Sequence, residues 1–148
     1  MPNDGDVILL AEDDPDDVRI IRRAFKSAGI NKNISVVGDG AELLDYLHQD
    51  GAYKDVGSAP KPSMIVLDIN MPGMNGLTAL QEVKLDPRAA SIPVIVLTTS
   101  NADLDIKAAY ALGAASYVTK PQDFNGYVEA SRRIRDFWFE LAELPTVA

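Results

Sequence analysis

The sequence predicts an α/β fold in which five parallel strands form a sheet between two layers of helices. Short apolar runs rich in β-branched residues alternate with helical patterns along the chain. These runs are mostly continuous, which is typical of strands buried on both faces of a parallel sheet. A chain of 148 residues, 47% of them hydrophobic, also has the usual size of one domain.

The five expected strands are the apolar runs at 7–11, 34–37, 64–67 and 94–97 and a weaker run at 115–118. The first helix should begin after Asp14, which can cap it, and end at Gly29. Further helices are expected near 41–49, 76–85, 103–112 and 125–144. The third of these five helices should stop at residue 85, because a residue that precedes proline disfavours the helical conformation.

The charge balance argues against several classes of partner. The chain has 22 acidic and 14 basic residues and a net charge of -8, which repels nucleic acid and anionic membrane surfaces. It has no cysteine, so disulfides and thiolate metal sites are excluded. The first residues lack the pattern of a signal peptide, and no apolar run approaches membrane-spanning length. We therefore expect a cytoplasmic protein with neither nucleic acid nor membrane as a partner.

Polar residues follow the expected strands where an apolar core would not select them. Glu12 and Asp13 follow the first strand, Asp68 the third, Thr98 the fourth and Lys120 the fifth. Right-handed connections bring the carboxyl ends of parallel strands to one edge of the sheet. Carboxylates gathered there repel one another, and a hard cation such as Mg²⁺ relieves the repulsion through oxygen ligands. The pattern predicts a Mg²⁺ site beside a carboxylate nucleophile.

Attack by Asp68 on a phosphoryl donor requires charge neutralisation on the transferred oxygens. One cation, one lysine and one hydroxyl group can supply it. Each residue also has a plainer interpretation: residues 12–17 as a solvated acidic run, Lys120 as a surface lysine, Thr98 as an ordinary strand residue and Tyr117 as a packing aromatic. The position of Asp68, directly after a buried apolar run, favours the chemical interpretation.

The motifs at 9–14, 66–76, 92–99 and 117–121 together resemble the receiver domain of bacterial response regulators in two-component signalling. The resemblance covers almost the whole chain. It implies a flavodoxin-like, doubly wound fold with strand order 2-1-3-4-5. It also implies that a sensor histidine kinase donates a phosphoryl group to Asp68, and that the protein is not an enzyme.

The same resemblance implies the metal ligands. Asp13 would bind Mg²⁺ directly, Glu12 through water, and Asp68 and the backbone carbonyl of Asn70 would complete the set. Glu12 replaces the aspartate that is commoner in the family, and the adjacent Asp14 adds an acid to which the resemblance gives no role.

The remaining implied roles concern the phosphoryl group and the switch. Lys120 would contact the phosphoryl oxygens, and Thr98 would supply a hydroxyl that moves on activation. Tyr117 would be the aromatic residue that turns inward. The peptide bond between Lys120 and Pro121 would be cis, an isomer that proline makes accessible.

An aspartate-based, Mg²⁺-dependent phosphohydrolase is the alternative. Such enzymes also form an aspartyl phosphate, but they usually carry a second aspartate two positions after the nucleophile. Here that position is Asn70, which cannot shuttle a proton. Their nucleophile also follows the first strand of the sheet, whereas Asp68 follows the third.

The C-terminal part suggests a partner. Only 28 residues follow Lys120 in the 148 residues, so we expect one receiver domain over 1–148, with an extended last helix and no output domain. An α-helical period turns Phe137 outward, with Phe139 beside it, and Leu141 inward. This ending resembles the small stand-alone regulators of bacterial phytochrome kinases. We expect a homodimer through Phe137, Phe139 and Leu144, with docking of these aromatics onto the kinase as the alternative.

Overall fold

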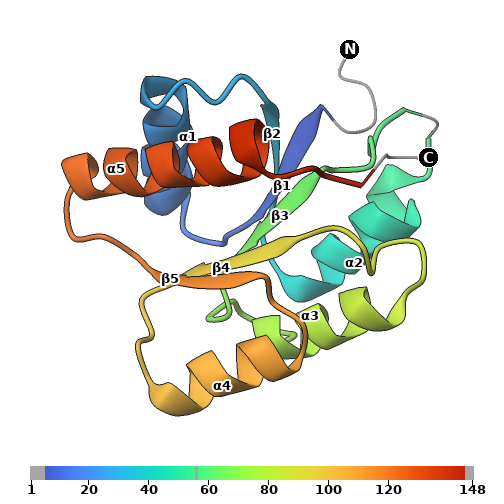
Figure 1. Ribbon diagram of the computed structural model, residues 1–148. Helices are drawn as coiled ribbons and strands as arrows, with labels where there is room; N and C mark the ends of the chain where they lie inside the picture. Colours follow the sequence, from blue (N-terminus) through green and yellow to red (C-terminus); the bar gives the residue numbers. More distant parts are fainter. Residues whose placement is uncertain (1–5, 56, 146–148) are drawn as a thin grey trace.

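The computed structural model describes residues 6–55 and 57–145. Figure 1 shows a single parallel sheet with helices on both faces. The strands lie in the order β2-β1-β3-β4-β5, and all four neighbouring pairs are parallel. Their bounds are β1 (Val7–Ala11), β2 (Asn33–Val37), β3 (Met64–Leu67), β4 (Val94–Thr98) and β5 (Ser116–Thr119). The predicted fold and strand order are therefore confirmed.

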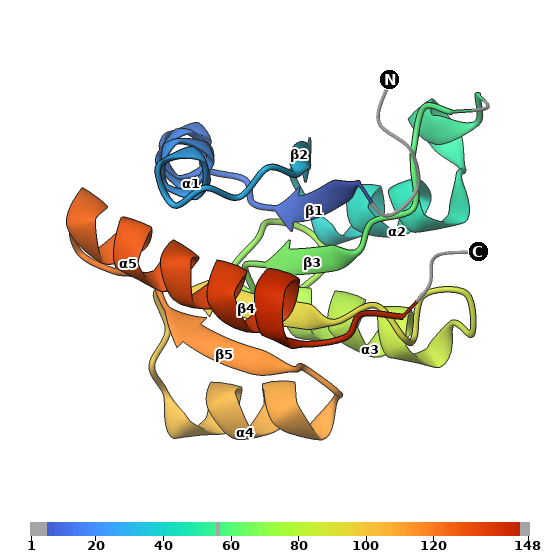
Figure 2. The same cartoon turned by 45° about the horizontal axis from the view of Figure 1, so that its top comes forward.

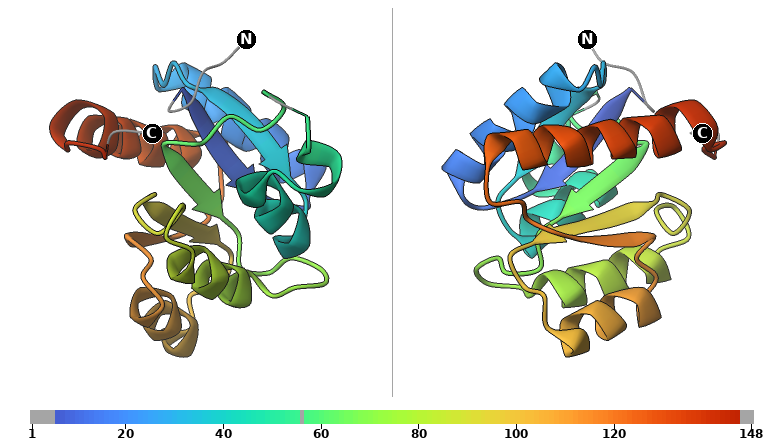
Figure 3. Two further views of the ribbon diagram at one scale, coloured as in Figure 1. Left: turned by 90° about the vertical axis from the view of Figure 1, so that its right-hand side faces the viewer. Right: turned by 60° about the vertical axis from the view of Figure 1, so that its left-hand side comes forward.

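Two layers of helices cover the sheet, as the turned views in Figures 2 and 3 show. One face carries α1 (Pro15–Ser27) and α5 (Phe124–Ile134), which pack against each other. The other face carries α2 (Gly40–His48), α3 (Gly76–Leu85) and α4 (Asp103–Ala111). Every residue of β1, β3 and β4 is buried, because helices cover both of their faces. No helix in the described residues is long and apolar enough to cross a bilayer.

Most predicted boundaries differ from the observed ones by at most a residue. The bounds of β1, β3 and α3 are those predicted. β2 and β4 are one residue longer, β5 and α2 are shifted by one residue, and α4 is one residue shorter. Asp14 caps α1 as expected, since its carboxylate accepts a hydrogen bond of 2.9 Å from the backbone N–H of Asp16. These agreements follow from buried runs and caps, both of which are local signals.

The predicted last helix is wrong in its second half. The α-helix ends at Ile134, and Arg135–Leu141 form a π-helical stretch that we label η2. A π turn pairs residues i and i+5, so side chains after Ile134 leave the faces that an α-helical period gives them. Leu141 is 74% exposed although we expected it inside, and Phe139 packs against the core. Phe137 is 50% exposed, as expected.

Two contacts hold η2 against the body of the domain. The Arg135 guanidinium donates a hydrogen bond of 2.5 Å to the carbonyl oxygen of Ala28, beyond the end of α1. The Lys32 ammonium lies 5.6 Å from the centroid of the Phe139 ring. Leu144, the third residue expected at a dimer interface, is half-buried. Of the three, Phe137 is therefore the most exposed to another molecule.

Gly76 lets α3 begin directly against the loop that follows β3. A Cβ atom at Gly76 would lie 2.4 Å from the Ile69 Cα and 2.7 Å from the Asp68 carbonyl oxygen. Both are backbone atoms and cannot move without displacing the loop.

We therefore predict that Gly76→Ala lowers the free energy of unfolding by about 1–3 kcal/mol, the usual cost of overpacking. Gly38→Ala is the matched control, since its Cβ would meet only the Glu42 Oε1, at 3.7 Å. Urea unfolding of both variants checks this. Equal stability of the two would contradict the packing described for Gly76.

Candidate functional site

The carboxyl ends of β1, β3, β4 and β5 bring the predicted residues together. Hydrogen bonds between strands continue one residue past the strand ends: the Asp68 N–H donates to the Ala11 carbonyl at 3.0 Å, and the Lys120 N–H donates to the Thr98 carbonyl at 2.7 Å. Asp68 therefore lies beside the end of β1, and Lys120 beside the end of β4. The backbone pairing of the strands alone thus brings these side chains to the same edge of the sheet.

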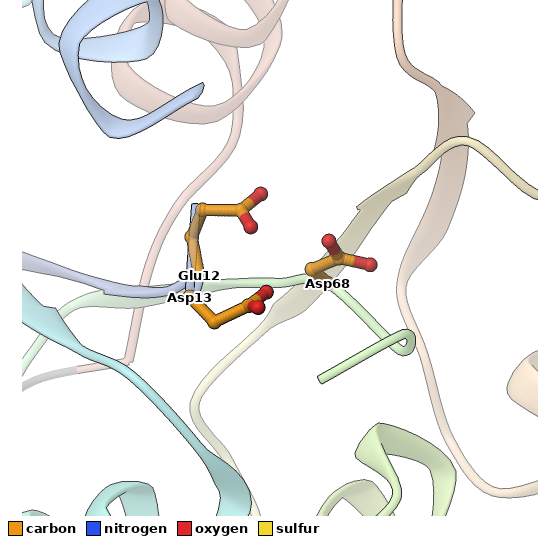
Figure 4. Close-up of side chains that lie close together, drawn as sticks. All are labelled: Glu12, Asp13 and Asp68. Atoms are coloured by element: carbon orange, nitrogen blue, oxygen red, sulfur yellow. The ribbon is translucent and has the colours of Figure 1, made fainter. Parts of the chain in front are cut away.

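Three carboxylates form an acidic cluster at this edge. Glu12, Asp13 and Asp68 each offer an oxygen atom, and these atoms lie within 4.8 Å of one another. Figure 4 shows Glu12 and Asp13 at the end of β1, on the same side as Asp68. Glu12 and Asp68 are buried, and Asp13 is exposed. Such a set of carboxylates with one side open to water fits a hard cation that keeps several of its waters.

Lys120 supplies the positive charge of the site. Its Nζ lies 2.6 Å from Glu12 Oε1, 2.7 Å from Asp17 Oδ2 and 3.0 Å from Asp68 Oδ2. The Lys120 side chain is only 6% exposed. An ammonium group has three N–H donors, and three carboxylates occupy them. A lysine with such contacts is part of the site and not a surface residue.

The pKa values of this cluster reflect a competition between burial and charge. Burial raises the pKa of Glu12 to about 7, against the hydrogen bonds from Lys120 and from the Asp14 N–H, and the charge of Asp68 raises it further. Burial lowers the pKa of Lys120, but the hydrogen bonds to Asp17, Glu12 and Asp68 outweigh it, and the net pKa is raised. Lys120 therefore keeps its charge at neutral pH, whereas burial opposes the charge on Glu12.

Asp68 is held by hydrogen bonds on both carboxylate oxygens. Its Oδ1 accepts from the Thr98 hydroxyl at 2.8 Å and from the Asn70 N–H at 2.9 Å, and its Oδ2 accepts from Lys120. The Asn70 side-chain amide also donates to the Thr98 hydroxyl oxygen at 3.3 Å. Thr98 is fully buried. A covalent change at the Asp68 carboxylate therefore alters the hydrogen bond that the Thr98 hydroxyl donates to it.

Tyr117 lies half-buried in β5, and two hydrogen bonds connect it to α4 and the loop before α4. Its hydroxyl donates to the Ser100 carbonyl at 2.9 Å, and its backbone N–H donates to the Tyr110 hydroxyl at 3.1 Å. Tyr117 also packs against the core cluster on the α2–α4 face of the sheet. It is thus a tethered residue and more than a packing aromatic.

Two features of the site differ from what the sequence suggested or lay beyond it. No peptide bond in the described residues is cis, so the expected cis bond between Lys120 and Pro121 is wrong. The backbone hydrogen bond to the Thr98 carbonyl and the three ion pairs hold Lys120 in the site. The contact between Asp17 and Lys120 was also not predicted, because Asp17 lies in the first turn of α1 and not at the end of a strand.

Comparisons with known proteins place this geometry in a family. The model of the "Response regulator receiver domain" family matches residues 8–132. "Response regulator Rcp1" of Synechocystis is 35% identical over 143 residues, which cover 97% of this chain and 95% of that protein. The Mn²⁺-bound structure of Rcp1 has a TM-score of 0.85 over 95% of this chain and 99% of that one.

Two further solved structures are similar. The phosphorylated cyanobacterial phytochrome response regulator RcpA is 34% identical, with a TM-score of 0.87 over 96% of this chain and 99% of that one. A response regulator in red light signaling of R. palustris is 36% identical, with a TM-score of 0.88 over 95% of this chain and 98% of that one. The expected family is therefore confirmed, and these relatives include phytochrome regulators.

Proposed function

Because this chain belongs to the response regulator receiver family, we propose that it takes a phosphoryl group from a sensor histidine kinase onto Asp68 and then changes conformation. The observation that carries the proposal is the environment of Asp68. This buried carboxylate has a hydroxyl on one oxygen and an ammonium on the other. Those are the groups that a transferred phosphoryl group needs around it.

In the transfer, a carboxylate oxygen of Asp68 forms a bond to phosphorus while the bond from phosphorus to the histidine nitrogen of the kinase breaks. The ammonium of Lys120 moves from the carboxylate to a phosphoryl oxygen, and the Thr98 hydroxyl can donate to another. A bound Mg²⁺ would neutralise charge on the phosphoryl oxygens. The protein's part is to hold these donors in place, which the contacts of Lys120 and Thr98 already do.

The acidic cluster supports Mg²⁺ as the cofactor. Asp13, the exposed member, is suited to bind the ion directly, while Glu12 is paired with Lys120 and is suited to bind through water. Asp68 and the backbone carbonyl of Asn70 complete the proposed set. The similar protein Rcp1 has a Mn²⁺-bound form, which supports a divalent cation in this family.

The switch proposal follows from the hydrogen bonds of Thr98 and Tyr117. A phosphoryl group on Asp68 draws the Thr98 hydroxyl away from the Asp68 carboxylate oxygen. The Tyr117 side chain then leaves its hydrogen bond to the Ser100 carbonyl and turns into the space that Thr98 vacates. This shifts a two-state equilibrium toward an active surface on α4, β5 and α5.

The kinase partner is proposed to be a bacterial phytochrome. RcpA is a phytochrome response regulator, and the R. palustris protein acts in red light signaling. Both match this chain over nearly its whole length. The net charge of -8 supports a cytoplasmic signalling role without nucleic acid contact.

A phosphohydrolase is the less favoured function. Such enzymes usually carry their acid–base aspartate two positions after the nucleophile, and here that residue is Asn70, which donates its amide to the Thr98 hydroxyl oxygen. We therefore propose a signalling protein and not an enzyme. Turnover of a phosphomonoester such as p-nitrophenyl phosphate would favour the hydrolase.

We predict that acetyl phosphate with Mg²⁺ adds one phosphoryl group to the wild-type protein and none to Asp68→Asn, because the amide is not a nucleophile. Intact-mass spectrometry measures the increment. Asp55→Asn, a change at an exposed position outside the site, is the control and should be labelled like wild type. Undiminished labelling of Asp68→Asn would remove Asp68 as the acceptor.

A homodimer is the second proposal about partners. Phe137 and Trp138, whose rings meet edge to face, line an apolar groove of about 700 Å³ between β5, α5 and η2. Glu129 and Arg133, which form an ion pair with each other at 3.3 Å, also line the groove and give it a charged rim. Since Phe139 and Leu144 are half-buried, Phe137 is the expected centre of this interface.

We predict that Phe137→Ala weakens the dimer at least tenfold, while Leu85→Ala does not, although Leu85 is 69% exposed on the opposite face. Burial of two Phe137 rings, at roughly 1.5–3 kcal/mol each, is the reason. Sedimentation velocity at tens of micromolar measures association, on the order of the concentration at which a weak dimer is populated. A wild-type monomer would leave kinase docking as the use of this groove.

A further inference from the structure

Asp17 is a third carboxylate on Lys120 that neither the acceptor role nor the metal cluster uses. It lies in the first turn of α1, and its Oδ2 is 2.7 Å from the Lys120 Nζ. Its side chain is 24% exposed, so the ion pair is largely shielded from water. The contact joins the start of α1 to the end of β5.

The three partners of Lys120 differ in what else they do. Glu12 and Asp68 belong to the acidic cluster that fits a cation, so their charge is shared once an ion binds there. Asp68 is also the proposed phosphoryl acceptor. The Lys120 N–H that now donates to its carboxylate must therefore turn to the phosphoryl group during the transfer. Asp17 is not among the clustered ligands, and its contact with Lys120 can persist through the transfer.

We propose that Asp17 is a positioning residue for phosphoryl transfer, which anchors the ammonium of Lys120 so that one N–H faces Asp68 and the incoming phosphoryl group. The inference rests on the proposed function. A lysine side chain has four rotatable bonds, and a fixed acceptor at its end reduces the conformations that compete with the productive one. Asp17 acts only through Lys120 and touches neither phosphoryl group nor metal.

Asp16 provides a matched control. It stands beside Asp17 in the same first turn, carries the same charge toward the helix dipole and pairs with Arg19 on the surface. Its side chain is 75% exposed, and none of its described contacts involves Lys120. Asp16→Asn and Asp17→Asn therefore remove the same charge from the same helix end, and only Asp17→Asn alters an ion pair of Lys120.

The test measures initial labelling rates with acetyl phosphate over a range of Mg²⁺ concentrations. In Asp17→Asn, the rate at saturating Mg²⁺ should fall about fivefold, the factor expected for losing a partly shielded ion pair. The Mg²⁺ concentration for half the maximal rate should stay within about twofold of wild type, because the metal ligands are untouched. Asp16→Asn should match wild type in both quantities.

A double-mutant cycle shows whether Asp17 and Lys120 are energetically coupled in the folded protein. Unfolding free energies of wild type, Asp17→Asn, Lys120→Ala and the double variant should be non-additive, since the two residues are in contact. Additive energies would overturn the inference. So would an Asp17→Asn rate equal to that of Asp16→Asn, or a rate above wild type, which would mean that Asp17 withholds Lys120. A wild type that takes no label would instead overturn the proposed function itself, and this inference with it.

Discussion

The site depends on a single ammonium group, Lys120 Nζ, which lies within 3.0 Å of three carboxylates at the carboxyl edge of the sheet. A fourth carboxylate, Asp13, belongs to the same acidic cluster. One positive charge cannot balance four negative ones, and burial of Glu12 adds a desolvation cost that raises its pKa to about 7. The edge is therefore electrostatically incomplete without a further cation, and an excess of carboxylates of this kind favours the binding of Mg²⁺.

Hydrogen bonds also connect this edge of the sheet with the strand and helix beside it. The Thr98 hydroxyl is bonded to Asp68, and Tyr117 in the neighbouring strand is tied to the loop before α4 and to Tyr110 in that helix. α4 has one buried residue, Ala109, so little apolar packing opposes its displacement. The hydrogen bonds of Tyr117 therefore tie β5 to a helix that buries little apolar surface.

Much of this could be predicted from the sequence because the decisive signals are local. Strands buried on both faces appear as continuous apolar runs, and a polar residue directly after such a run marks the functional edge, as Asp68 does after β3. Two features could not be predicted. The ion pair between Asp17 and Lys120 depends on how α1 packs over the sheet. In the sequence, Asp17 is already explained as an acidic residue in the first turn of a helix, where it favours the helix dipole. The π turns of η2 depend on the docking of Arg135 onto α1, and they reverse the expected environments of Phe139 and Leu141.

The most direct measurement of the central claim is the unfolding free energy of the protein as a function of Mg²⁺ concentration. A cation that binds the folded state alone stabilises it by RT ln(1 + [Mg²⁺]/Kd), or about 2.7 kcal/mol at one hundred times Kd. The gain should be larger at pH 8 than at pH 6, because Glu12 with a pKa of about 7 is protonated at the lower pH and ionised at the higher. It should shrink strongly in Asp13→Asn. An unfolding free energy that does not respond to Mg²⁺ at either pH would contradict the claim that this edge is completed by a cation.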